Sequence, residues 1–139
     1  MTFPSPLFEA GFVLSRLLFS VVIGYLALGN LLDLDQSIGY AEHKGVPVAV
    51  VSVPLGSLGL IVGALAVLTG IYPGVGALVV IGCLVPITGL MHDFWTLEGE
   101  DRQTEQIHFF KNIGLIGTAV AFVTLSTVPW PLAVSITLW

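Results

Sequence analysis

Long apolar stretches dominate this chain, and short polar segments separate them. Residues 45–91 and 112–139 contain no Asp, Glu, Lys or Arg. Because a helix needs about 20 apolar residues to cross the hydrocarbon of a bilayer, the pattern predicts four spanning helices, at about residues 12–32, 49–69, 75–94 and 107–128. The predicted fold class is therefore all-α integral membrane, an antiparallel four-helix transmembrane bundle that forms a single domain over residues 1–139.

The polar segments between these stretches predict the connections. Residues 33–47 are punctuated by Gly and Pro, which indicates a solvent-side loop or a short interfacial helix. The sequence TGIYPGVG at 69–76 predicts a tight turn. Residues 98–105, EGEDRQTE, are expected to form a solvated turn before the last helix.

Both ends of the chain are also expected to lie at the membrane. No Lys or Arg precedes the first apolar run, so we take it as a spanning helix rather than a signal peptide. At the other end, PWP at 129–131 is expected to stop the last helix. The tail 129–139 is too short to span and is expected at the interface, with Trp130 and Trp139 as anchors.

Composition supports the membrane assignment and excludes some functions. The chain is 55% hydrophobic and 9% charged, whereas soluble domains are about 25% charged. A net charge of −5 argues against a nucleic-acid-binding surface. The single cysteine, Cys83, cannot form an intrachain disulfide, so any thiol chemistry would need a partner.

Charge also predicts an orientation. Four spans place both termini on one side, which carries only Arg16, whereas Lys44, Arg102 and Lys111 fall on the other. The positive-inside rule then predicts a multi-pass protein of the cell membrane with its termini on the extracellular side.

Small residues recur within the predicted spans at spacings of three and four, which is typical of close helix packing. Packing inside one bundle is the favoured interpretation over a dimerisation face or a ligand slot. The glycines concerned are Gly56, Gly59, Gly63, Gly82, Gly89, Gly114 and Gly117.

Polar residues gather where the third and fourth predicted helices approach the second long connector. Antiparallel helices bring these ends to one membrane depth, where Asn30 also falls. Because buried polar groups at this depth need partners, we expect Asn30, His92 and Asn112 to hydrogen-bond one another. The complete predicted layer is Asn30, His92, Asp93, His108, Lys111 and Asn112.

Arg16 lies about one turn inside the opposite boundary. It could extend to lipid headgroups or pair with Glu9, which lies on the same helix face. Alternatively, its guanidinium could face the bundle and bind an anion, a quinone oxygen or a partner subunit.

Metal binding and nucleophilic catalysis have weak support. His92 and His108 could approach each other, but two histidines without a second carboxylate on a helix face make a poor metal or haem signature. Cys83 has apolar neighbours and no base nearby in sequence. No catalytic residue and no metal ligand is predicted, and the chain is not expected to be catalytic alone.

Several segments together resemble the DoxX family of small four-helix membrane proteins. They cover about residues 12–126 and are LSRLLF (14–19), YAEHKGVP (40–47), HDFW (92–95) and FKNIGLIG (110–117). The resemblance implies membrane redox chemistry, because the family takes its name from a small subunit of an archaeal quinol oxidase and thiosulfate:quinone oxidoreductase system. It also implies a distant likeness to sterol-binding bundles with an internal pocket. Carried over by position, the matching polar residues are Arg16, His92, Lys111 and Asn112.

Three functions follow as hypotheses. The first is a redox-associated subunit that binds quinone as its cofactor or anchors a soluble or membrane oxidoreductase partner. The second is a structural or assembly protein that recruits partners through residues 96–106, and the third is a lipid-binding bundle with a cavity along its small residues. A homo-oligomer is compatible with each of them.

Overall fold

The protein is almost entirely helical in the computed structural model, which describes residues 3–137. Four of its helices are long and apolar enough to cross a membrane. The predicted all-α membrane fold is therefore confirmed. The elements in chain order are α1 (Pro6–Leu32), α2 (Leu34–His43), α3 (Ala49–Thr69), α4 (Pro73–Met91), the 3₁₀ helix η1 (Phe94–Thr96) and α5 (Gly99–Leu125).

A tight turn joins α3 to α4, as the sequence predicts. Gly70 ends α3 with a φ of 75°, a left-handed conformation that glycine adopts without a Cβ clash. Pro73 then occupies the first turn of α4, where its missing N–H leaves no helical bond unmade.

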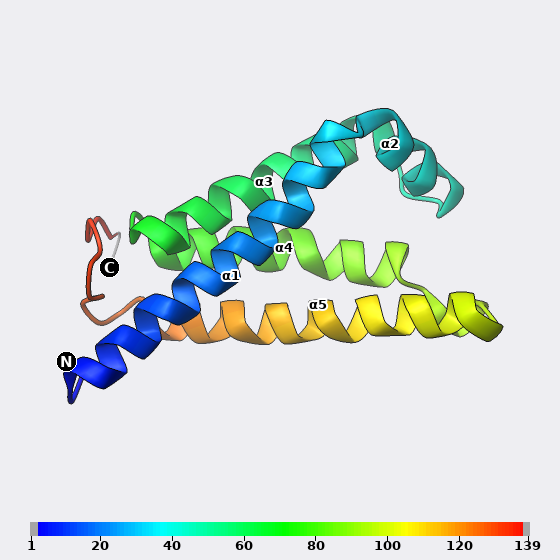
Figure 1. The fold of residues 1–139 in the computed structure, drawn as a ribbon. Coiled ribbons are helices and arrows are strands. Elements are labelled where there is room, and N and C mark those ends of the chain that lie inside the picture. The colour runs from blue at the N-terminus through cyan, green and yellow to red at the C-terminus, as the bar shows by residue number, and fades with distance from the viewer. Residues whose placement is uncertain (1–2, 138–139) are drawn as a thin grey trace.

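The spanning helices pack as neighbours in the order α1, α3, α4, α5, with α3 in contact with both α1 and α4. Figure 1 shows the N-terminus, the α3–α4 turn and the C-terminal tail at one end of the molecule, and α2 with the α4–α5 connection at the other. We call these the tail end and the α2 end.

Close helix approach is concentrated between α3 and α4. A Cβ built on Gly63 would lie 2.7 Å from the Gly76 carbonyl oxygen, and one on Gly76 would lie 2.4 Å from the Ala66 Cβ. A Cβ built on Gly59 would lie 3.0 Å from the Cys83 Sγ. The backbones of α3 and α4 can approach closely here only because these positions lack side chains.

The other glycines predicted to pack are not at close contacts. A Cβ at any of them would meet no other part of the described chain within 4 Å, apart from the local helix itself. The spacing alone therefore overestimated the packing stripe, and it omitted Gly76. These open positions are Gly56, Gly82, Gly89, Gly114 and Gly117.

One connecting segment differs from its predicted form, and another takes one of its two predicted forms. Residues 98–105 are helical from Gly99 onward, so α5 begins well before residue 107 and ends at Leu125, before the PWP sequence. The segment 33–47 contains α2, in agreement with the interfacial-helix alternative.

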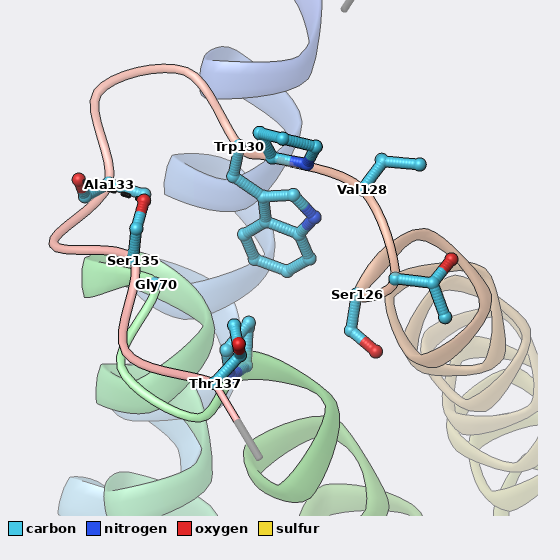
Figure 2. Close-up of a pocket in the computed structure, with 10 residues that line it drawn as sticks. Gly70, Ser126, Val128, Trp130, Ala133, Ser135 and Thr137 are labelled. Carbon is cyan, nitrogen blue, oxygen red and sulfur yellow. Dashed lines mark hydrogen bonds between the residues drawn. The ribbon is translucent and has the colours of Figure 1, made fainter. Parts of the chain in front are cut away.

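The tail folds back onto the bundle and buries Trp130, which is therefore not the exposed anchor that the sequence predicts. Trp130 is only 7% exposed, and its ring makes an edge contact with Phe12 at 4.9 Å between centroids. Its indole Nε1 donates a 2.7 Å hydrogen bond to the Leu125 carbonyl oxygen. Figure 2 shows the indole directed between the end of α5 and the returning tail, beside a cavity of about 220 Å³. Trp139, the other predicted anchor, lies outside the described residues.

Candidate functional site

At the α2 end of the molecule, an ion pair joins the residue after α2 to the segment that follows α4. Lys44 follows α2, and its Nζ lies 2.5 Å from Oδ1 of Asp93, between α4 and η1. The side chains are 10% and 26% exposed, respectively. This contact joins segments that are 49 residues apart in the chain.

Next to this ion pair, three further side chains form a second polar connection between the same parts of the molecule. The Tyr40 hydroxyl donates a 2.7 Å hydrogen bond to Oε1 of Glu105, in the second turn of α5. The other carboxylate oxygen, Oε2, lies 2.7 Å from Nδ1 of His92. Because Tyr40 lies in α2 and Lys44 directly follows it, both connections hold α2 against the α4–α5 connection. We call Tyr40, Lys44, His92, Asp93 and Glu105 the polar clamp.

The predicted polar layer is partly assembled around this clamp. The rings of His92 and His108 stack with their centroids 5.4 Å apart. Lys111 is half-buried and close enough to His92 for their charges to interact. His92, Asp93, His108 and Lys111 therefore lie at one end of the bundle, as predicted.

The hydrogen bonds expected among Asn30, His92 and Asn112 do not form within residues 3–137. His92 is bonded to Glu105 instead. Asn112 is buried at 3% exposure, whereas Asn30 is exposed and faces a cavity on another side of the bundle. The expected bonds to His92 are absent because Glu105 is its partner instead, and Glu105 is also held by Tyr40 of α2. The predicted layer contained neither Glu105 nor any residue of α2.

Arg16 lies at the tail end, far along α1 from this layer. It is 2% exposed, and it donates hydrogen bonds to the carbonyl oxygens of Val67 and Leu68 in α3 and of Pro131 in the tail. Its guanidinium also lies 5.2 Å from the Trp130 ring centroid. Arg16 therefore faces the bundle, where its guanidinium donates to backbone carbonyls and not to Glu9.

Tyr40, Lys44 and Glu105 were not identified as site residues from the sequence, although a signal for Glu105 was present. Glu105, His108 and Asn112 recur at spacings of three and four, so they share one helix face once α5 is extended back to Gly99. In the predicted turn at 98–105, Glu105 would not share a helix face with His108 and Asn112.

A cavity of about 850 Å³ lies between α1, α2, α3 and α4 in the half of the molecule nearest α2. Its walls are mainly apolar and include Val53, Ile87 and Leu90. Glycines at open positions, Gly56 and Gly82, contribute to the space because they carry no side chain. The small residues in this part of the bundle thus create a cavity rather than a tight contact.

The polar side chains that line this cavity come mainly from its α2 side. Asn30 of α1 and Gln36, Ser37 and Tyr40 of α2 belong to this group. Tyr40 belongs to both features. Its side chain lines the cavity, and its hydroxyl donates a hydrogen bond to Glu105 of the polar clamp.

Aromatic side chains surround the α4–α5 connection. Phe94 makes edge contacts with Trp95 and Phe109 at centroid distances of 5.4 and 5.3 Å, and Arg102 lies 5.9 Å from the Phe94 ring centroid. Aromatic residues are enriched at membrane–water boundaries. Their position is consistent with a boundary near the polar clamp.

Metal ligation and thiol chemistry have no assembled site in the described part of the chain. Among residues 3–137, no three His, Cys, Asp or Glu side chains are grouped so that they could hold a metal ion. Cys83 is a half-buried free thiol that lines the large cavity.

These features define a multi-pass helical membrane protein with a large, partly open cavity beside a polar clamp. The DoxX family profile matches residues 11–93, more than half of the chain, and the chain belongs to that family. The matched region contains Arg16, His92 and Asp93, whereas FKNIGLIG at 110–117 lies beyond it. No curated protein and no solved structure matches the chain.

Proposed function

We propose that this chain supports membrane redox metabolism by holding a quinone or a similar amphipathic lipid in the large cavity. The cavity itself, about 850 Å³ with polar groups on its α2 side, is the observation that carries the proposal. Sites for small molecules are typically about 300–1,000 Å³, apolar, and provided with a few polar groups that orient the ligand.

The chemistry of a quinone fits the distribution of side chains. Its ring oxygens could accept hydrogen bonds from the side-chain amides of Asn30 and Gln36, while its apolar substituent would contact residues such as Ile87 and Leu90. Membership of the DoxX family agrees with a redox-associated role. The chain would act as a binding subunit, with electron transfer carried out by a partner oxidoreductase.

Mass spectrometry of molecules co-purified with the full chain tests the proposal. Gly82→Phe would fill the cavity, since Gly82 lines it and its Cβ position is open. Gly117→Phe is the matched control, because its Cβ position is equally open but lies on α5 away from the cavity lining. We expect Gly82→Phe to reduce bound quinone or lipid per protein at least about fivefold. Equal ligand content in both variants and the wild type would rule the proposal out.

Anchoring of a partner is a second candidate function, and the form of α5 favours it. Glu98, Glu100 and Asp101 are exposed at the start of this helix, which extends beyond its apolar part. A helical surface is a more rigid docking element than the loop predicted here. Replacing the three acids by amides while keeping Glu105 should change the proteins captured from gently solubilised membranes. Unchanged partners, and an unchanged stoichiometry in native mass spectrometry, would contradict this role.

A further inference from the structure

Two hydroxyl groups that line the large cavity already have their protons engaged. The Tyr40 hydroxyl donates to Oε1 of Glu105 at 2.7 Å. The Ser52 hydroxyl donates to the Pro47 carbonyl oxygen at 2.6 Å. A hydroxyl has one proton but two acceptor lone pairs. Each group can therefore offer a cavity ligand an acceptor, but not a donor.

The direction of both bonds is determined by the partner. An ionised carboxylate and a backbone carbonyl can only accept. Glu105 also receives His92 Nδ1 at 2.7 Å, which keeps its carboxylate in place. Partial burial and then the neighbouring Glu105 raise the pKa of Tyr40 above its usual value, so the phenol keeps its proton at physiological pH.

The remaining polar groups of the cavity can bond to a ligand that donates as well as to one that accepts a hydrogen bond. Asn30 and Gln36 carry amides, which provide both. The hydroxyls of Ser37 and Ser57 have no hydrogen-bond partner within residues 3–137, so each can rotate to give or to receive a bond. Discrimination at this cavity therefore depends on Tyr40 and Ser52.

We infer that the cavity selects ligands with a hydroxyl head, a hydroquinone or an isoprenoid alcohol, over the same molecules with a carbonyl head. A hydroxyl head can donate to the Tyr40 oxygen, whereas a carbonyl head would place two acceptors together. A carbonyl head placed against Tyr40 could be bonded there only if the Tyr40–Glu105 bond broke. The inference rests on the proposed function, because it assumes that an amphipathic ligand occupies this cavity.

Two matched pairs of probes test the selectivity on the detergent-solubilised full chain. One pair is a short-chain hydroquinone and its quinone, titrated under argon, and the other is farnesol and farnesal. Dissociation constants come from calorimetric titration. We expect the hydroxyl member of a pair to bind about five- to tenfold more tightly, the value of one net hydrogen bond.

Variants separate the role of Tyr40 from general effects on folding. Tyr40→Phe combined with Ser52→Ala removes both acceptors and should bring the affinity ratio close to one. Glu105→Leu removes the acceptor of the Tyr40 proton, which can then turn towards the ligand, and should also reduce the ratio, even if the double variant proves unstable. Tyr25→Phe is the control, because Tyr25 lies on α1 with 77% exposure and does not line the cavity.

Each outcome has a definite meaning. Selectivity in either pair that is lost in the Tyr40→Phe, Ser52→Ala double variant or reduced in Glu105→Leu supports the inference. The pair that shows it identifies a quinone-type or a prenol-type ligand. Equal binding of both members, or selectivity that survives both variants, overturns it. If Gly82→Phe still abolishes binding in that case, the proposed function stands without the selectivity. No binding of any probe to the wild type overturns the selectivity at once, whereas the proposed function is decided separately by the co-purified ligand.

Discussion

The Nε of Arg16 in α1 lies 3.1 Å from the carbonyl oxygen of Val67 in the last turn of α3. The carbonyls at the end of a helix have no partner within that helix. Arg16 supplies donors to two of them and also to Pro131 in the tail, so one side chain joins α1, α3 and the C-terminal segment.

Loss of the Arg16 side chain is expected to destabilise the tail end. Arg16→Met should lower the free energy of unfolding by about 3 kcal/mol, because buried carbonyls lose charged donors. Arg16→Lys should recover only part of this loss, since an ammonium lacks the planar fork of donors. Thermal and denaturant unfolding in detergent measures both. Arg102→Met, at an exposed site, should change stability by less than about 0.5 kcal/mol, and equal losses at both sites would contradict the assigned role.

Glycine-to-alanine substitutions should affect stability differently at a tightly packed glycine and at an open one. Gly76→Ala places a Cβ 2.4 Å from the Ala66 Cβ, which α3 and α4 can accept only by moving apart. We expect a loss of about 2 kcal/mol from overpacking. Gly117→Ala should be neutral or slightly stabilising, because its Cβ position is open and alanine favours a helix. The same unfolding measurement applies, and similar effects at both positions would show that α3 and α4 are not in tight contact.

Trp130 should behave as a core residue rather than as an interfacial anchor. Trp130→Ala removes a buried indole that contacts Phe12 and Phe122, with an expected cost of about 3 kcal/mol. Trp95→Ala provides the comparison, because Trp95 is 53% exposed and should cost less than about 1 kcal/mol. Melting temperatures in one detergent decide between them, and a tryptophan that only contacts lipid would give a small effect at position 130.

The ion pair of the polar clamp should be detectable as an interaction energy. A double-mutant cycle with Lys44→Met and Asp93→Asn should give a coupling of about 1 kcal/mol, as expected for a partly exposed pair. A cycle that combines Lys44→Met with Asp35→Asn serves as the control, because Asp35 is exposed near the start of α2. Its coupling should be close to zero. A coupling near zero for Lys44 and Asp93 would mean that this contact does not hold α2 in place.

The polar residues of the site illustrate how far periodicity can be used. His92 and His108 were expected at one depth because antiparallel helices end together, and their rings do stack. Glu105 was assigned to a turn because its segment is strongly polar, which describes both a solvated loop and a helix that protrudes from the membrane. Only the tertiary contacts with Tyr40 and His92 distinguish these two possibilities.

The glycine pattern shows the same limit in the apolar part. Gly63 and Gly82 both lie on predicted small-residue faces, yet one meets a neighbouring backbone and the other lines a cavity. Spacing states which residues share a face of one helix. It does not state how far away the facing helix lies, which depends on crossing angles and on every other contact.

The sequence by itself determined that this is a membrane protein with four spanning helices, because uncharged apolar stretches of sufficient length have no other stable arrangement in lipid. It also determined which ends of those helices are polar. Only the tertiary structure decided that Arg16 binds the end of α3, that Trp130 is buried, and that α2 and Glu105 form a clamp beside a cavity. These features depend on contacts between residues far apart in the chain, and such contacts leave no periodic signal within any single segment.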